Sequence, residues 1–521
     1  MYTYKNIECQ KMTEEDIINT SKLFSENYGV WSNKSKINPG KPVKLQPSRI
    51  KKDFVDKPDR YVSMVFHDDK LVGHAFYMRR TVHKNKKITW ILQLVVDKEH
   101  RGNNIGTKLL HSIFGLSDSF ACGLYTSNPM TIKALENATF RHVDVQKTIK
   151  NIRVLKEAAY DIFDDTIWID NCHDGVVDTN FFVDHSSLAS NIQKAYSNGG
   201  FPFNSNLNEG CEWLAFTFKS QEPFIDNDIQ LKILTDYSDD LLKTAYSHMN
   251  MKNQAWTLNT AKEVDMIIKN IGNCKRILDL GCGQGRHSNL LAEKGYNVTA
   301  VDFSAENIQK AKNNSTSNVK YCAADARNYK EKDKFDACLG MYDVIGSFPD
   351  EEENIKIVRN AYKNLRQEGI FIISVMNMEL TYARCKKNKN IFSGIDENID
   401  KLLKLEPTNT MQKTGDVFDG KKILIDEETG ICYRKEQFFS EDYLPEEYIV
   451  RDRRYTRKGI INMLHREGFS VEEAYYFNAK DINKRLGPED RKSKEILIVA
   501  KKKNSIYKLF QRLFNKNIFW K

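Results

Sequence analysis

The chain has 521 residues, 40% of them hydrophobic and 29% charged, which is a globular composition in a chain too long for a single hydrophobic core. No apolar run reaches the roughly 20 residues of a membrane span, and ten scattered cysteines lack the paired spacing of zinc sites or disulfide frameworks. The net charge is +9, but residues 501–521 hold seven basic residues and no acid, so the body is close to neutral. This balance argues against a nucleic-acid partner.

The N-terminus, Met-Tyr-Thr-Tyr-Lys-Asn-Ile-Glu, has no apolar core of a secretory signal. Together with the cysteine usage, it predicts a reducing, cytoplasmic location. No histidine or cysteine pattern indicates a metal site. Nothing in the sequence indicates the oligomeric state.

Residues 1–150 follow a first α/β pattern, for which we predict one domain. Aromatic, strand-like runs in residues 151–220 are interpreted as an extension of it, and the acidic stretch 221–240 as a linker. In chain order, the pattern predicts a helix over 12–29, paired strands over 60–67 and 70–79, a strand over 87–97, a helix over 106–114, a strand over 120–126 and a helix over 130–137.

Residues 241–502 follow a second α/β pattern. Seven apolar runs after a helix over 257–270 predict a doubly wound, seven-stranded sheet whose last two strands form an antiparallel pair. An insert near 385–450, between the fifth and sixth strands, is expected to cover a substrate. The last segment, 503–521, predicts a basic amphipathic helix, which either docks on the body or makes weak contact with a membrane surface.

The most informative stretch is Asp279-Leu-Gly281-Cys-Gly283-Gln-Gly285, where a short apolar strand meets the start of a helix. Glycines at alternate positions allow a tight turn and let a ligand lie against bare backbone. A second strand ends in Asp302, which is placed to take ribose hydroxyls in a doubly wound sheet.

This arrangement resembles the first motif of class I S-adenosylmethionine-dependent methyltransferases. The resemblance covers roughly residues 240–502 and implies that the glycines line the methionine portion of the cofactor, that Asp302 takes its ribose and that Asp325 reads its adenine. The implied cofactor-binding residues are Asp279, Gly281, Gly283, Gly285, Asp302, Phe303, Asp325, Ala326 and Met341.

The fourth strand leads into Tyr342-Asp343, and this segment looks like that of small-molecule amine methyltransferases of the glycine and sarcosine type. It lacks the Asn/Asp-Pro-Pro-Tyr/Phe pattern of nucleic-acid amino methylases. We therefore expect a small polar methyl acceptor, an amine, with Tyr342 and Asp343 at the reaction site. Asp343 has two interpretations of equal weight: it holds a substrate cation, or it caps the next helix.

In the first domain, residues 93–106 form a strand, a loop and a helix start. Successive backbone N–H groups at such a helix start bind a pyrophosphate. The segment resembles motif A of the GNAT family of N-acetyltransferases, over about residues 5–150. This resemblance implies a mixed sheet with helices as the fold of the first domain and acetyl-CoA as the cofactor. The implied contacts are Leu94, Val95, Val96, Arg101, Gly102, Asn103, Asn104, Ile105, Gly106 and Asn128.

Leu135 stands where many GNAT members carry the tyrosine that protonates the departing thiolate. Tyr125, at the end of the preceding strand, is a possible replacement, although a core-facing tyrosine is the commoner role at such a position. The sequence therefore predicts a bifunctional acetyltransferase and methyltransferase. The alternative is a methyltransferase with a GNAT-like module that recognises a substrate or partner without catalysis.

Overall fold

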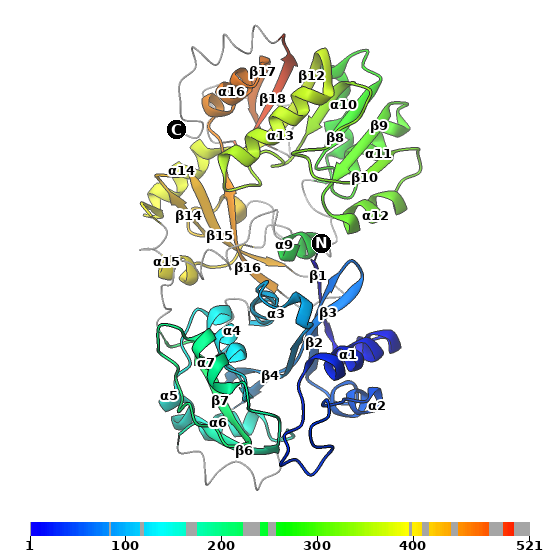
Figure 1. Cartoon of the computed structure of the whole chain (residues 1–521). Helices are drawn as coiled ribbons and strands as arrows, with labels where there is room; N and C mark the ends of the chain where they lie inside the picture. The colour runs from blue at the N-terminus through cyan, green and yellow to red at the C-terminus, as the bar shows by residue number, and fades with distance from the viewer. Residues whose placement is uncertain are drawn as a thin grey trace. The chain divides into compact units, whose positions relative to one another are not determined.

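A computed structural model gives the fold of most of the chain. It describes residues 2–82, 85–114, 119–162, 174–221, 240–247, 257–394, 399–408, 416–438, 446–478 and 493–504. The chain forms two compact units, of which the first contains residues 1–233 and 439–448 (Figure 1). The predicted boundaries at 150, 220 and 240 stay predictions, and the predicted tail lies, from residue 505 onward, outside the described residues.

The first unit is built on a mixed sheet of seven strands in the order β1-β2-β3-β4-β5-β7-β6. Only β4 and β5 are parallel neighbours. The strands are β1 (Tyr2–Glu8), β2 (Arg60–His67), β3 (Lys70–Val82), β4 (Lys86–Val96), β5 (Ala121–Thr126), β6 (Val176–Phe181) and β7 (Gly210–Phe218). The predicted N-terminal mixed sheet is confirmed. The sequence analysis missed β1, an edge strand whose polar residues hide its alternation.

Helices cover both faces of this sheet. On one face, α3 (Ile105–Phe114), α4 (Pro129–Thr139) and α7 (Leu188–Ala195) pack against a core that includes Tyr77 and Trp213. The other face carries α1 (Glu14–Asn27), α2 (Pro47–Ile50) and α6 (Ile152–Ala158). A short helix, α5 (Val145–Lys150), precedes α6.

The second unit contains a seven-stranded sheet in the order β10-β9-β8-β11-β12-β18-β17. Its strands are β8 (Arg276–Leu280), β9 (Asn297–Asp302), β10 (Lys320–Ala323), β11 (Phe335–Gly340), β12 (Leu365–Met376), β17 (Phe469–Phe477) and β18 (Glu495–Lys502). The first five strands are parallel, and β18 is antiparallel to both of its neighbours. The predicted doubly wound sheet is confirmed.

Two groups of helices bury the two faces of this sheet (Figure 1). The first group is α10 (Thr260–Ile271), α11 (Arg286–Glu293) and α12 (Ala305–Asn313), and the second is α13 (Glu351–Asn364) and α16 (Arg457–Arg466). A further helix, α9 (Asp240–Ser247), precedes α10. Helices on both faces bury both sides of the parallel strands, which explains their continuous apolar runs.

The insert between β12 and β17 forms a small sheet of its own, in the order β13-β14-β15-β16. Its elements are α14 (Met378–Lys387), β13 (Ile391–Phe392), α15 (Ile399–Lys404), β14 (Ile423–Asp426), β15 (Ile431–Phe438) and β16 (Glu446–Arg453). Cys385 of α14 packs with Ile423, Ile425 and Cys432 in the core of this insert. The sequence analysis predicted the insert but not its sheet.

Candidate functional site

The carboxyl ends of the parallel strands in the second unit bring the predicted methyltransferase residues together. In the register of the sheet, Asp279 of β8 lies beside Ala300 and Leu339, and Asp302 of β9 lies beside Ala323. Ligands of doubly wound sheets bind at this edge. The strand order therefore places the acids of the glycine motif and of the second strand next to each other.

The three glycines of the turn after β8 have different roles. A Cβ at Gly281 would lie 2.4 Å from the Val344 side chain, and one at Gly285 would lie 2.3 Å from the Tyr321 hydroxyl, so packing excludes a side chain at both. A Cβ at Gly283 would meet no described atom within 4 Å. The space over Gly283 is thus a cradle that a side chain would fill, and it fits a bound S-adenosylmethionine.

Asp302 holds this turn in place. Its carboxylate accepts hydrogen bonds from the amide of Gly283 at 2.8 Å and from the amide of Ser304 at 2.9 Å. Burial raises the pKa of Asp302, and these amides offset part of that rise. The neighbouring Phe303 ring lies 4.7 Å from the ammonium of Lys243 on α9.

Two other residues predicted to bind the cofactor accept hydrogen bonds from elsewhere in the chain. Asp279 is buried and accepts a hydrogen bond from the Ser288 hydroxyl of α11, and burial raises its pKa to about 6. The carbonyl of Ala326 accepts from Asn360 Nδ2 at 2.9 Å. Their predicted contacts with the cofactor stay predictions.

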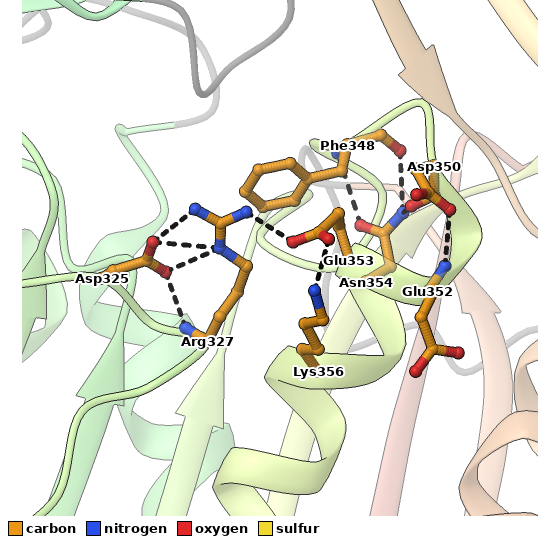
Figure 2. A network of polar contacts seen from close by, with 8 residues as sticks. All are labelled: Asp325, Arg327, Phe348, Asp350, Glu352, Glu353, Asn354 and Lys356. Atoms are coloured by element: carbon orange, nitrogen blue, oxygen red, sulfur yellow. Dashed lines mark hydrogen bonds and ion pairs between the residues drawn. The ribbon is translucent and has the colours of Figure 1, made fainter.

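Asp325, the predicted adenine reader, belongs to a network of ion pairs (Figure 2). Arg327 Nε lies 3.0 Å from each carboxylate oxygen of Asp325, and the Arg327 guanidinium also pairs with Glu353. The same guanidinium lies 4.6 Å from the Phe348 ring centroid. Asp325 is therefore fixed by Arg327, and a role in reading adenine stays a prediction.

Tyr342 and Asp343 follow Met341 at the end of β11 with left-handed backbone, at φ of 57° and 64°. Such backbone costs a non-glycine residue roughly 1–2 kcal/mol, and it is often found at functional sites. The Tyr342 amide donates to Ser374 Oγ at 2.7 Å, and its ring lies 4.5 Å from the Arg286 guanidinium. The next helix, α13, is capped by Asp350, so Asp343 is not its cap.

Glu263 of α10 connects this segment to the glycine turn, and the sequence analysis missed it. Its side chain is 0% exposed and contacts Arg286, His287 Nε2 at 2.7 Å and the Tyr342 hydroxyl. Burial alone would raise the pKa of Glu263, but the His287 hydrogen bond and the Arg286 charge lower it to about 2. Burial and Arg286 lower the pKa of His287 to about 4, so this imidazole is neutral.

A second missed carboxylate is Glu495, the first residue of β18. It pairs in register with Met376, the last residue of β12, and so lies at the same edge of the sheet. Its Oε2 is buried and has no hydrogen-bond partner among the described residues. Burial and the nearby charges of Asp343 and Glu263 raise the pKa of Glu495.

Asp343 lies in the same electrostatic environment. Burial raises its pKa to about 6, against the opposing charges of Arg454 and Arg434 in the insert. No sequence pattern indicated Glu495, because it opens an ordinary apolar strand more than 150 residues after Asp343.

In the first unit, strands β4 and β5 separate part of the way along. They pair from Ile88 with Ala121 to Ile91 with Leu124 and not beyond. Residues 94–96 of β4 pair with β3 on one edge only. The other edge, which the sequence predicted for the pantetheine amides, is thus free of strand pairing.

The turn after β4 fits a pyrophosphate. Gly102 has a φ of 84°, and a Cβ there would meet no described atom within 4 Å. The hydrogen bonds of α3 begin at the amide of Lys108, which donates to the carbonyl of Asn104 at 2.9 Å. The amides of Ile105 and Gly106 precede it in the first turn of the helix, where backbone N–H groups have no carbonyl acceptor within the helix.

Side chains around this turn stabilise it. Arg101 donates to the carbonyls of Val96 at 3.1 Å and Asn27 at 2.6 Å, and Asn103 donates to the His100 carbonyl at 3.2 Å. Asn128 caps α4, because its Oδ1 accepts from the Met130 amide at 3.0 Å. The cofactor contacts of these residues stay predictions.

Tyr125 lies just beyond the last β4–β5 pair and is half-buried. Burial and the nearby Glu212 raise the pKa of this phenol, so it keeps its proton at neutral pH. This protonation is what a general acid needs, and the role itself stays a prediction.

Comparisons with known protein families decide the domain composition. Residues 271–423 match the family described as a methyltransferase domain, and residues 27–129 match the acetyltransferase (GNAT) family. The chain contains a GNAT acetyltransferase domain and an S-adenosylmethionine-dependent methyltransferase domain. Both resemblances found in the sequence are thereby confirmed.

The chain is similar in sequence to several methyltransferases. A glycine/sarcosine N-methyltransferase of Aphanothece halophytica is 26% identical over 151 residues, or 28% of this chain and 57% of the relative. A ubiquinone biosynthesis O-methyltransferase of Pelagibacter ubique is 33% identical over 119 residues, or 22% of this chain and 46% of the relative. The chain thus spans about half the length of these relatives.

Among solved structures, the CcbJ methyltransferase of Streptomyces caelestis aligns with a TM-score of 0.38 and 14% identity, over 50% of this chain and 99% of that one.

Within the described ranges, no helix is long and apolar enough to cross a membrane. The same ranges hold no group of three or more His, Cys, Asp or Glu side chains suited to a metal ion.

Proposed function

We propose that the methyltransferase domain methylates a small amine that binds at Asp343 and Glu495. The observation that carries this proposal is the buried Oε2 of Glu495, which has no hydrogen-bond partner among the described residues and lies near Asp343 at the cofactor edge of the sheet. Buried carboxylates require a partner, and a substrate ammonium is the complementary one. The similarity to a glycine/sarcosine N-methyltransferase also supports an amine acceptor.

Within this proposal each residue has a defined task. Bound S-adenosylmethionine supplies a methyl group on a positively charged sulfur. The turn at Gly283 and the carboxylate of Asp302 bind and orient the cofactor, and Glu263 holds the Tyr342 hydroxyl. Asp343 and Glu495 hold the amine and accept the proton that it must lose before its lone pair can attack.

Replacing Glu495 with Gln is expected to weaken acceptor binding by about 1.5–3 kcal/mol, roughly 10- to 150-fold, because an ammonium loses a charge-assisted hydrogen bond. The acceptor is first identified by mass spectrometry after incubating the full chain with methyl-labelled S-adenosylmethionine and a small-metabolite extract. KM for that acceptor is then compared in the wild type and the variant.

The matched control is Glu368→Gln, which removes an exposed carboxylate that pairs with Lys503 at 2.8 Å near the opposite edge of the sheet. It should leave KM for the acceptor unchanged. S-adenosylmethionine binding, followed by calorimetry, should be the same in all three proteins. A labelled product methylated on oxygen or carbon, or an unchanged KM in Glu495→Gln, would refute the amine proposal.

We also propose that the GNAT domain binds acetyl-CoA and transfers its acetyl group to an amine. The open turn at Gly102 and the unpaired edge of β4 support this proposal. The rival interpretation is a recognition module that has lost catalysis. Because such a module requires no cofactor, binding of acetyl-CoA distinguishes the two.

We propose a cytoplasmic location for the whole enzyme, where both cofactors are made available by metabolism.

Acetyl-CoA at 100 times its Kd is expected to stabilise the GNAT domain by about 2.7 kcal/mol, measured as a shift of its thermal transition. Gly102→Val should abolish the shift, because the side chain fills the space at the helix start. Gly199→Val is the matched control, since Gly199 has the same φ of 84° and equally open surroundings away from the turn. The absence of a shift in the wild type would favour the recognition module.

A further inference from the structure

The GNAT domain contains a buried carboxylate that no basic side chain contacts among the described residues. Glu212, the third residue of β7, is 3% exposed, and its Oε2 has no hydrogen-bond partner among the described residues. Burying a carboxylate without a partner is costly, and a fold keeps such a group where a ligand completes it. No described cation forms an ion pair with it.

The register of the sheet places Glu212 one strand away from the gap between β4 and β5, on the far side of β5. Tyr125, which lies just past the last β4–β5 pair, pairs across β5 and β7 with Leu214. Side chains alternate along a strand, so Glu212 shares its face with Leu214 and therefore with Tyr125. The charge of Glu212 in turn raises the pKa of Tyr125, which reflects their proximity.

Aromatic side chains lie in the neighbourhood of this carboxylate. Tyr28, which follows α1, is 36% exposed and interacts electrostatically with Glu212 and Tyr125. Its ring meets the Phe181 ring of β6 edge-on at 5.8 Å, and Trp31 meets Phe181 edge-on at 5.1 Å. Aromatic faces attract cations, so these rings add to the attraction that the buried carboxylate exerts on a cation.

We infer that this cluster, Tyr28, Trp31, Phe181 and Glu212, is the acceptor site of the acetyl-transfer domain, and that Glu212 takes the proton of a primary ammonium. The inference rests on the acetyl transfer proposed above. Glu212 was not among the residues that the sequence indicated, because a single glutamate in an aromatic strand carries no motif.

The proposed step balances in protons and electrons. The ammonium gives one proton to Glu212 Oε2, and the freed lone pair on nitrogen bonds to the thioester carbonyl carbon of acetyl-CoA. The carbon–sulfur bond breaks with its electron pair on sulfur, and the second proton lost by nitrogen ends on that sulfur. The acid then returns its proton to solvent.

The surroundings suit a group that exchanges a proton near neutral pH. Burial raises the pKa of Glu212 to about 7, and hydrogen bonds from the Thr179 side chain and the Ser127 backbone limit the rise. The titratable groups whose pKa responds to its charge are Tyr28 from the end of α1, Tyr125 from β5 and, on the opposite face of its own strand, Cys211. A general base works best when its pKa lies near the working pH.

The test compares the full chain with its Glu212→Gln variant, using phenethylamine as the probe and 2-phenylethanol as its uncharged counterpart. In calorimetry without acetyl-CoA, phenethylamine should bind the wild type and bind the variant at least about tenfold more weakly, because an ion pair is lost. Binding of 2-phenylethanol should be equal in both. Glu26→Gln, which removes an exposed carboxylate of α1, is the matched control.

With acetyl-CoA present, the variant should acetylate phenethylamine roughly 10²- to 10⁴-fold more slowly and lose the wild type's rise in rate near pH 7. Its acetyl-CoA thermal shift should be unchanged. Equal amine binding and equal pH profiles in the two proteins would overturn the inference, as would a wild type that binds acetyl-CoA but leaves the amine unmodified. A wild type that shows no acetyl-CoA shift would instead refute the proposed acetyl transfer.

Discussion

Glu263→Ala is expected to destabilise the methyltransferase domain by about 3–5 kcal/mol, the cost of removing one partner from a buried ion pair. The carboxylate is fully buried and is shared by Arg286, His287 and Tyr342. Its loss leaves the Arg286 guanidinium without this partner and frees the strained Tyr342 segment. The measurement is urea unfolding of the full chain, following the transition that S-adenosylmethionine shifts.

The same group should make the domain sensitive to acid. The pKa of Glu263 is about 2 in the fold against 4.5 for a free glutamate, so its stabilisation is complete above about pH 4.5 and is lost as the pH falls toward 2. The contribution is about 3 kcal/mol. Glu263→Gln should flatten the dependence of unfolding free energy on pH in this window.

Glu306→Ala is the matched control for Glu263. Glu306 pairs with Lys310 one helical turn away, at 3.3 Å, and both side chains are about one third exposed. Exposed pairs of this kind contribute less than about 1 kcal/mol. If the two variants lose equal stability, the buried network does not have the structural role assigned to it.

Asp302→Ala is expected to weaken S-adenosylmethionine binding by about 1–3 kcal/mol, roughly 5- to 150-fold. Asp302 fixes the amide of Gly283 at 2.8 Å, so its removal loosens the turn as well as deleting the predicted ribose contact. Isothermal titration of the full chain with S-adenosylmethionine measures the change. Asp302→Asn, which keeps one acceptor oxygen, should lie between the wild type and the alanine variant.

Asp336→Ala provides the matched control for Asp302. Asp336 also accepts two backbone amides, from Lys275 at 2.7 Å and Arg276 at 2.9 Å, but it does so at the amino ends of the strands. This variant should lose stability and still bind the cofactor with unchanged affinity. Equal losses of affinity in both variants would show that general loosening of the sheet, and not a contact at its carboxyl edge, explains the effect.

Local sequence patterns predicted the two domain types and most of the strands. The run from Asp279 to Gly285 was informative because a strand, a tight turn and a helix start depend on residues that are neighbours in the chain. The segment 93–106 was informative for the same reason. The edge strand β1 and the sheet of the insert were missed, because their short, mixed-polarity runs have no clear period.

Only the tertiary structure could decide which charged side chains meet. Glu263 lies 79 positions from Tyr342. The charge of Asp343 acts on Glu495, which belongs to the last strand along the chain. The pairing of β7 with β5 places Glu212 two residues from Leu214, the register partner of Tyr125. Asp325, chosen from its position after a strand, proved to be paired with Arg327.

Turns and domain types could be predicted from the sequence and the partners of the buried acids could not, for a physical reason. Backbone turns and amphipathic periods are set by residues close in sequence, so a single chain reveals them. The burial, pairing and proton affinity of a carboxylate depend on the groups that packing brings around it. The sequence alone therefore determined two transferase folds and their glycine-rich turns, and the tertiary structure decided which buried carboxylate oxygens lack a hydrogen-bond partner among the described residues.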